Sequence, residues 1–373
     1  CRLKNNMSSM PESESAFSFK RTNRLRGMLI LGVFLFHFCN FFPAEVKPDI
    51  GHTFVGAFFL LSGFGLLESF KRKENYLDEF VGKKTARLLV PVWIAGMIVL
   101  MAKWIVFDNH SILGEHTYLF DIISGGTTTT VSWFVVELIF FYLFFYLAFK
   151  HLSVRWAIVA VSAAVALLMI LLSQQEGMWY GSGMMFPAGL VLSYFREKIE
   201  SVKPHTILIV SVTISLIFAY YMKMFRLPWY SGLIYGNLQC LLVSLLVILS
   251  LLGRKTGVGK WLVSLLLCNI VYYALETSLQ LGPNIITVMP VMTIFLVLAG
   301  MDTIAPLTNL FGNVSYEFYL IHAMMIFVSM TWFSDMLLCF ISSLVLSLII
   351  AIAINRVSKI FFDNKKKGGP QSD

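Results

Sequence analysis

The chain of 373 residues is 57% hydrophobic and only 13% charged, and its mean hydropathy is +0.76. This composition excludes a soluble globular protein, and the long apolar runs predict an all-α, polytopic transmembrane helical bundle. The runs are continuous rather than alternating, which excludes an outer-membrane barrel. The net charge of +8 does not indicate a nucleic-acid partner, because Lys and Arg of membrane proteins gather in cytoplasmic loops.

The chain divides into one large membrane domain and two short tails. We expect residues 1–20 to form a polar N-terminal tail, residues 21–362 the transmembrane domain and residues 363–373 a basic C-terminal tail. Hydrophobicity predicts spans at 27–42, 52–70, 88–107, 131–149, 154–172, 179–195, 205–222, 231–252, 261–281, 285–300, 314–333 and 336–361.

Alternate loops of this arrangement are basic, which sets the expected orientation. Residues 71–87 and the tail from Arg356 to Lys367 are examples, whereas 301–313 carries neither Lys nor Arg. The positive-inside rule therefore predicts that both termini are cytoplasmic. The spans 261–281 and 285–300 are joined by only three residues and also fit a re-entrant pair, so the sequence leaves ten and twelve helices open.

Residues 21–42 combine three arginines with an apolar helix that contains a histidine. Arg26 precedes His37 by eleven residues, or about 16 Å along a helix axis, so Arg26 can sit at the membrane edge while His37 lies in the hydrocarbon. An ionisable side chain at that depth is costly and indicates function, and imidazole suits proton transfer near neutral pH. The alternative is a histidine that only hydrogen-bonds a neighbouring helix.

The second span contains the string FFLLSGF at residues 58–64. Its small residues, Ser62 and Gly63, are typical of close helix packing. The alternative interpretation is that they leave room for a ligand, which makes Ser62 a candidate for substrate binding.

The loop that follows ends in KKTAR, directly before a Leu-Leu-Val-Pro sequence. Lys84 and Arg87 are three residues apart and share one face if a helix begins there. Two cations on one face suit a phosphate-bearing ligand. A charged loop that serves only to set the topology is the other interpretation.

The fourth span carries a glutamate among aromatic and aliphatic residues. A glutamate such as Glu137 costs free energy inside a membrane unless its carboxylate is paired or protonated. Counting the rise per residue places Glu137 and His37 at a similar depth, and a carboxylate beside an imidazole would orient the ring and stabilise its charged form. Pairing with another polar group for packing alone is the alternative. Trp133, one turn before Glu137, is a candidate for substrate binding.

A last polar stretch, GNVSYEFYLIH, occupies residues 312–322. Ser315, Tyr319 and His322 are spaced at i, i+4 and i+7, so they fall on one helix face. His322 lies inside the membrane, where it is a candidate for binding acceptor or donor. Helix faces of this kind also lock neighbouring helices together, which is the alternative.

Together these stretches resemble the acyltransferase 3 family of integral membrane enzymes. Arg26 and His37 match the family's Arg-x10-His pair, and the other strings resemble its FFxLSGF, Trp-x3-Glu-x4-Tyr and GxxSYxxYLxH patterns. The KTAR string resembles the family's Arg-x-x-Arg, except that Lys84 replaces the first arginine and loses its bidentate geometry. Asn23 stands where the family often has Asp.

The resemblance implies an acyltransferase of the plasma (inner) membrane. It implies transfer of an acyl group, most often acetyl, from acyl-coenzyme A to a hydroxyl of a carbohydrate or lipid-linked glycan. His37 is expected to act as general base, directly or through an acyl-histidine, with Glu137 as its partner. The expected ligands of donor or acceptor are Arg26, Lys84, Arg87, Ser62, Trp133, Ser315, Tyr319 and His322.

We expect no metal and no bound cofactor, and we expect acyl-coenzyme A, the glycan acceptor and the lipid bilayer as partners. The intramembrane residues also fit another class, a proton-coupled transporter or flippase in which His37, Glu137 and His322 relay protons. Such a protein would not bind coenzyme A and would not depend on Lys84 or Arg87.

Overall fold

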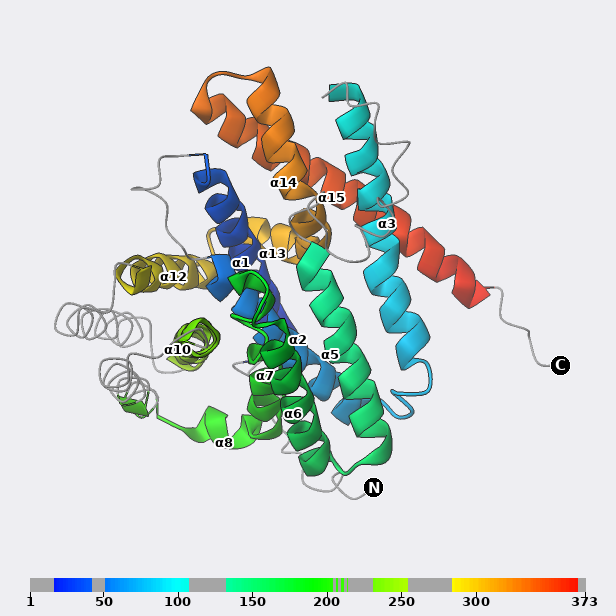
Figure 1. Cartoon of the computed structure of the whole chain (residues 1–373), viewed down its shortest axis with the longest axis vertical. Coiled ribbons are helices and arrows are strands. Elements are labelled where there is room, and N and C mark those ends of the chain that lie inside the picture. Colours follow the sequence, from blue (N-terminus) through cyan, green and yellow to red (C-terminus); the bar gives the residue numbers. More distant parts are fainter. Residues whose placement is uncertain are drawn as a thin grey trace.

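The computed structural model describes residues 17–41, 51–106, 132–203, 231–253 and 284–367, with a few positions between 206 and 213. Within these ranges the chain forms helices and no strand, which confirms the predicted all-α class (Figure 1). The first helices are α1 (Phe19–Cys39), α2 (Gly51–Arg72), α3 (Phe80–Val106), α5 (Ser132–His151) and α6 (Val154–Leu172). After these come η5 (Gly177–Trp179), α7 (Met185–Tyr194), α8 (Arg196–Ser201), α10 (Ser231–Gly253), α12 (Asn284–Gly300), α13 (Ala305–Asn313), α14 (Ser315–Trp332) and α15 (Met336–Lys367).

Five of the described helices, α2, α3, α5, α6 and α15, are long and apolar enough to cross a membrane. The pair α12 and α13 is a sixth candidate and is bent by 106°. These helices confirm a polytopic membrane protein. The expected span 261–281, and 205–222 except for isolated positions, lie outside the described residues, so the count of ten to twelve helices stays a prediction.

The helices that carry His37 and His322, α1 and α14, are not among these strongly apolar helices. Their sequences interrupt the apolar run with charged and polar residues, among them Arg26, His37 and His322. A helix of this kind is stable in a membrane only when other helices cover its polar groups. Both helices accordingly pack against each other and against several neighbours.

Glycines bring the backbones of α2 and α7 into contact. A Cβ added at Gly63 would collide with the carbonyl oxygen of Phe186, and a Cβ added at Gly189 would collide with that of Leu60. Membrane helices associate largely through such close packing of small residues. Gly63 in the FFLLSGF string therefore serves helix packing, which was one of the two interpretations of that string.

The helix α13 lies across the first half of α1, in a segment that was expected to be a loop with neither Lys nor Arg. A Cβ at Gly27 would collide with the carbonyl oxygen of Thr308, and one at Gly312 with that of Asn23. The Nδ2 of Asn23 also donates hydrogen bonds to the carbonyl oxygen of Asn309, at 3.3 Å, and to Oδ1 of Asn313, at 3.0 Å. Asn23 is therefore a donor that holds α13 against α1.

The helix α7 begins at Met185, six residues after the start of the predicted span 179–195. Asn237 of α10 explains how the non-helical backbone before α7 is stabilised. Its Nδ2 donates to the carbonyl oxygen of Tyr180, at 2.6 Å, and its Oδ1 accepts from the backbone amide of Met184, at 3.0 Å. Irregular backbone inside a membrane protein requires partners of this kind.

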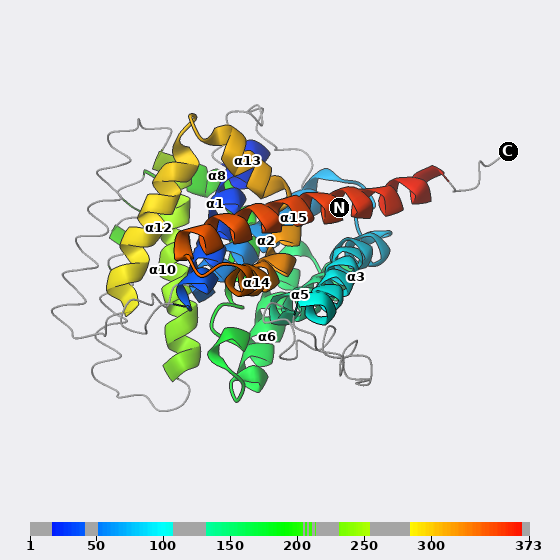
Figure 2. The same cartoon turned by 90° about the horizontal axis from the view of Figure 1, so that it is seen from above.

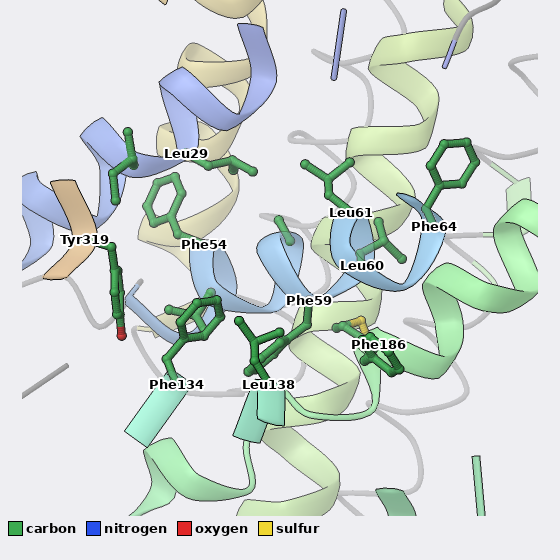
Figure 3. Packing of buried hydrophobic residues seen from close by; sticks show 14 of the residues in the cluster. Leu29, Phe54, Phe59, Leu60, Leu61, Phe64, Phe134, Leu138, Phe186 and Tyr319 are labelled. Carbon is green, nitrogen blue, oxygen red and sulfur yellow. The ribbon is translucent and has the colours of Figure 1, made fainter. Parts of the chain in front are cut away.

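An aromatic core holds α5 against α2 and α7. The ring of Phe59 on α2 lies 4.9 Å from that of Phe134 and 5.1 Å from that of Phe141, both on α5. Phe141 in turn lies 5.1 Å from Phe186 of α7, in the range of favourable aromatic pairs. Figure 3 shows Phe59 facing Phe134 and Leu138, with Phe186 beyond them. This packing fixes which face of α5 is turned towards α2.

A buried carboxylate ties the end of α2 to α7 and α8. Glu68 accepts hydrogen bonds from the Ser193 hydroxyl, at 2.8 Å, and from Arg196, at 2.5 Å. Lys71 and Arg72 each lie 3.4 Å from the same carboxylate. Three cations and a hydroxyl therefore satisfy one acid at this end of the bundle.

The described part of the chain begins and ends in helices. Phe17 and Ser18 are buried, and α1 starts at Phe19, so these described residues of the expected tail 1–20 pack against the bundle. At the other end α15 continues to Lys367 and projects beyond the remaining helices (Figure 2).

Candidate active site

The structure brings together the two histidines that the sequence places at opposite ends of the chain. His37 lies near the end of α1 and His322 in the middle of α14. Their ring centroids are 5.0 Å apart, with the ring planes at 61°. His322 is completely buried, whereas His37 is half-buried. The pair therefore combines a partly exposed histidine with a fully buried one.

A hydrogen bond and a stacked aromatic ring hold His322 in place. Its Nδ1 lies 2.7 Å from the backbone carbonyl oxygen of Tyr319, and its ring stacks on Phe318 with centroids 6.0 Å apart and planes at 8°. Its other nitrogen, Nε2, is buried and has no hydrogen-bond partner among the described residues. The ring thus has one satisfied and one unsatisfied nitrogen.

Tyr319 and Ser315 share a helix face with His322, as predicted, but they have different surroundings. The ring of Tyr319 lies 5.7 Å from that of His322 and 4.9 Å from that of Phe134 on α5. The Ser315 hydroxyl donates to the carbonyl oxygen of Gly312, at 3.1 Å, at the junction of α13 and α14. Tyr319 therefore belongs to the histidine site, whereas the Ser315 hydroxyl is engaged at the helix start.

Glu137 is buried in α5, and its exposed fraction is 1%. Neither carboxylate oxygen has a hydrogen-bond partner among the described residues, so the expected hydrogen bond to His37 is not formed in this structure. The carboxylate interacts electrostatically with Tyr319 instead. Glu137 and His322 thus both interact with Tyr319, and the role of Glu137 stays a prediction.

Trp133 lies one turn from Glu137 on the same helix. Its ring contacts that of Phe134, at 6.2 Å, and that of Trp179 in η5, at 6.4 Å. Trp133 therefore packs against η5, the short turn before α7, at the beginning of α5.

The predicted cations form a second centre, around Lys84. Because α3 begins at Phe80, Lys84 and Arg87 are both helical and share a face, as the sequence interpretation required. Lys84 interacts electrostatically with Arg87, Lys73 and Arg26. Positively charged residues from α1, from α3 and from the turn between α2 and α3 thus lie close together, and such a cluster favours the binding of an anion.

Two tyrosines complete this basic centre. The Lys84 ammonium lies 5.7 Å from the ring centre of Tyr142 and 6.0 Å from that of Tyr76, within the range of cation–π contacts. The Ser62 hydroxyl and the Tyr142 hydroxyl are hydrogen-bonded at 3.0 Å. Tyr76 lies in the turn between α2 and α3, where burial raises its pKa to about 12. Its hydroxyl therefore stays protonated at neutral pH.

Sequence reasoning did not single out Tyr76, Tyr142 or Lys73 as site residues. Tyr142 was the last residue of the Trp-x3-Glu-x4-Tyr pattern, so a signal for it was available. Tyr76 and Lys73 lie in a turn, where no helical spacing relates them to Lys84.

The two centres share the helices α1 and α5. Arg26 and His37 are about 16 Å apart along α1, and Tyr142 and Glu137 are about 7.5 Å apart along α5, from the rise per residue. In addition, the Tyr316 hydroxyl of α14 donates to the carbonyl oxygen of Leu88 on α3, at 2.9 Å. A basic centre and a histidine centre are therefore joined by rigid helices.

Comparison with known proteins identifies the family. A sequence profile described as the acyltransferase domain, acyltransferase 3, matches residues 21–356, nearly the whole chain. The chain belongs to the acyltransferase 3 family. This acyltransferase is a multi-pass membrane protein, and both centres described above fall within the matched residues. No curated protein and no solved structure gives a significant match to the acyltransferase.

Proposed function

We propose that this acyltransferase moves an acyl group, most often acetyl, from acyl-coenzyme A to a hydroxyl of a carbohydrate or lipid-linked glycan in the plasma (inner) membrane. The observation that carries the proposal is the arrangement of two centres on the same helices. One centre is cationic and aromatic and suits a phosphate-rich nucleotide. The other is a pair of histidines, one buried and one half-buried, that suits proton transfer.

The donor binds at the basic centre. Lys84, Arg87 and Arg26 supply positive charge for the phosphates of coenzyme A, since charge-assisted hydrogen bonds to phosphate are among the strongest in proteins. Tyr76 and Tyr142 offer aromatic faces beside these cations. The basic loops predict that this end of the bundle faces the cytosol, where acyl-coenzyme A is found.

The chemistry takes place at His37. The acceptor oxygen attacks the thioester carbonyl carbon, the C–O bond forms, the C–S bond breaks, and His37 removes the proton of the hydroxyl. The thiolate leaves and is protonated by the imidazolium, which restores neutral His37. A two-step route through an acyl-imidazole uses the same residue, and a burst of acyl-enzyme in rapid-quench kinetics distinguishes it from direct transfer.

The test follows an acyl label from donor to glycan. Purified protein in proteoliposomes receives radiolabelled acetyl-coenzyme A and a mixture of candidate glycans, and kcat and the donor KM are measured. We expect the label in the glycan with the wild type and no transfer with His37→Ala. Because Lys84→Ala/Arg87→Ala loses two phosphate contacts, we expect its donor KM to rise about tenfold or more.

Lys198→Ala is the matched control. Lys198 of α8 also lies over an aromatic ring, 5.8 Å from the centre of Phe195, but outside the basic centre. Its loss should leave the donor KM unchanged. A well-folded wild type that binds no coenzyme A would overturn the proposal and favour the proton-coupled transporter.

A further inference from the structure

The starting point is the chemistry of the two nitrogens of His322. A backbone carbonyl oxygen can only accept a hydrogen bond, so Nδ1, which lies 2.7 Å from the Tyr319 carbonyl oxygen, carries the hydrogen. In a neutral imidazole Nε2 then presents a lone pair. This tautomer is assigned from the hydrogen-bond partner.

The lone pair on Nε2 is buried, and it is unsatisfied within the described residues. An acceptor in this state costs free energy, and the cost is greater in a membrane, where no water replaces the missing donor. The ring cannot easily turn away, because it is stacked on Phe318 and bonded to the Tyr319 carbonyl. The structure therefore holds an unsatisfied hydrogen-bond acceptor, Nε2 of His322, in a fixed position inside the site.

The neighbouring ring is that of His37, and the separation of the two rings suits a hydrogen bond. An N–H···N hydrogen bond of about 2.9 Å between two imidazoles places their centroids roughly 5 Å apart. The observed separation is 5.0 Å. A hydrogen bond between the two rings is therefore compatible with the observed positions of α1 and α14.

We infer that His322 is the positioning residue of His37 and that its Nε2 accepts a hydrogen bond from the His37 imidazolium during acyl transfer. The inference rests on the proposed function. As the acceptor hydroxyl attacks the thioester, its proton moves to one nitrogen of His37. The N–H on the other nitrogen donates to His322, which stays neutral throughout. When the thiolate leaves and takes up the proton, His37 is neutral again.

The inference assigns to His322 the part that Glu137 was expected to play. The Glu137 carboxylate interacts with Tyr319, whose ring lies 5.7 Å from that of His322. A neutral acceptor favours the imidazolium less strongly than a carboxylate would, so it orients His37 without holding it in the charged form. His37 then remains a neutral base before the reaction begins, as the mechanism requires.

Three substitutions of His322 separate positioning from packing. His322→Gln keeps an acceptor, its amide oxygen, near the place of Nε2. His322→Asn keeps a donor near the place of Nδ1 for the Tyr319 carbonyl but has no atom at Nε2. His322→Phe keeps the ring stacked on Phe318 and has neither polar group.

The readout is kcat and the donor KM in the acetyl-transfer assay, with folding checked by size-exclusion chromatography. Loss of an orienting partner lowers kcat by about 10²-fold or more. We expect this loss for His322→Asn and His322→Phe with the donor KM unchanged, and we expect His322→Gln to recover at least tenfold of it. Wild-type kcat in the Asn or Phe variant overturns the inference and leaves the proposed function standing.

A Gln variant as slow as the Asn variant also overturns the inference, because an acceptor at Nε2 would then be irrelevant. Failure of the proposed function looks different, since the wild type itself would transfer no label. In that case there is no acyl transfer in which His322 could position His37, and the inference is overturned together with the proposed function.

Discussion

At the scale of single residues, the contribution of an ion pair to stability depends on how far its groups are exposed to water. Glu68 accepts from Ser193 and Arg196, and its side chain is 12% exposed. Glu79 pairs with Lys83 on the surface, and its side chain is 68% exposed. Hydrogen bonds to a charged group that is shielded from water contribute more to stability than exposed pairs do.

We therefore predict that Glu68→Gln lowers the free energy of unfolding by about 2 kcal/mol, because its cations lose their counter-charge. The matched change Glu79→Gln should cost less than about 0.5 kcal/mol. Both are measured by thermal unfolding of the purified protein in detergent. Equal losses for the two variants would contradict the structural role of Glu68.

Asn23 offers a second residue-scale prediction, because it differs from the Asp that is common in the family. Its Nδ2 faces the carbonyl oxygen of Asn309, which can only accept a hydrogen bond. Asn23→Asp replaces this donor by an acceptor, and we expect a loss of about 1–3 kcal/mol in stability. Asn40→Asp, at the exposed end of the same helix, should cost less than about 1 kcal/mol. A stable Asn23→Asp variant would show that α13 can be held by other contacts.

At the scale of elements, the bundle is held together where glycines allow two backbones to touch. Gly63 and Gly189 face each other's helices across the α2–α7 crossing, and an added Cβ at either position would meet a carbonyl oxygen. A carbonyl oxygen in a helix cannot move aside as a flexible side chain can. The helices must therefore separate to accept even one methyl group.

We expect Gly189→Ala to lower stability by about 2 kcal/mol or more, since overpacking forces a backbone shift. The control is Gly82→Ala in α3, where an added Cβ would have no neighbour within 4 Å. Alanine is the better helix former, so this variant should gain about 0.5–1 kcal/mol. Opposite signs of the shift in melting temperature confirm the prediction, and a stable Gly189→Ala variant refutes it.

At the scale of the whole molecule, the basic loops predict the orientation in the membrane. Glu74 lies in the turn between α2 and α3, and Gln174 in the turn after α6. Both side chains are exposed. Among the described residues, three candidate spans, α3, α5 and α6, lie between them. With the loop that the sequence predicts between the spans 88–107 and 131–149, we expect the two positions to face opposite sides of the membrane.

We predict that a membrane-impermeant maleimide labels Glu74→Cys only from the cytosolic side and Gln174→Cys only from outside, because the turn at Glu74 carries the basic residues. The parent chain, with its own cysteines, provides the background. Labelling of Glu74→Cys in intact cells would reverse the orientation and would remove the donor site from the cytosol.

The sequence alone predicted the all-α class and most described helices, and it singled out His37, His322 and Lys84, because apolar runs and intramembrane ionisable residues are strong signals. It did not predict that Glu137 lies beside Tyr319 rather than hydrogen-bonding His37. Counting residues gives depth along a helix axis, but the rotation of α5 is set by contacts such as Phe59 with Phe141. The break before α7 was missed for a similar reason, since Asn237 stabilises it from a distant helix.

The contact between α1 and α13 also has a consequence for the timing of synthesis. Asn23 and Asn313, which this contact joins, are separated by 290 positions in the chain. At about 5–20 residues per second, roughly 15–60 s pass between the synthesis of the two segments. Throughout that interval the arginines and His37 of α1 have no partner from α13 or α14. The histidine centre is therefore completed only near the end of translation, and a chain released early contains His37 without His322.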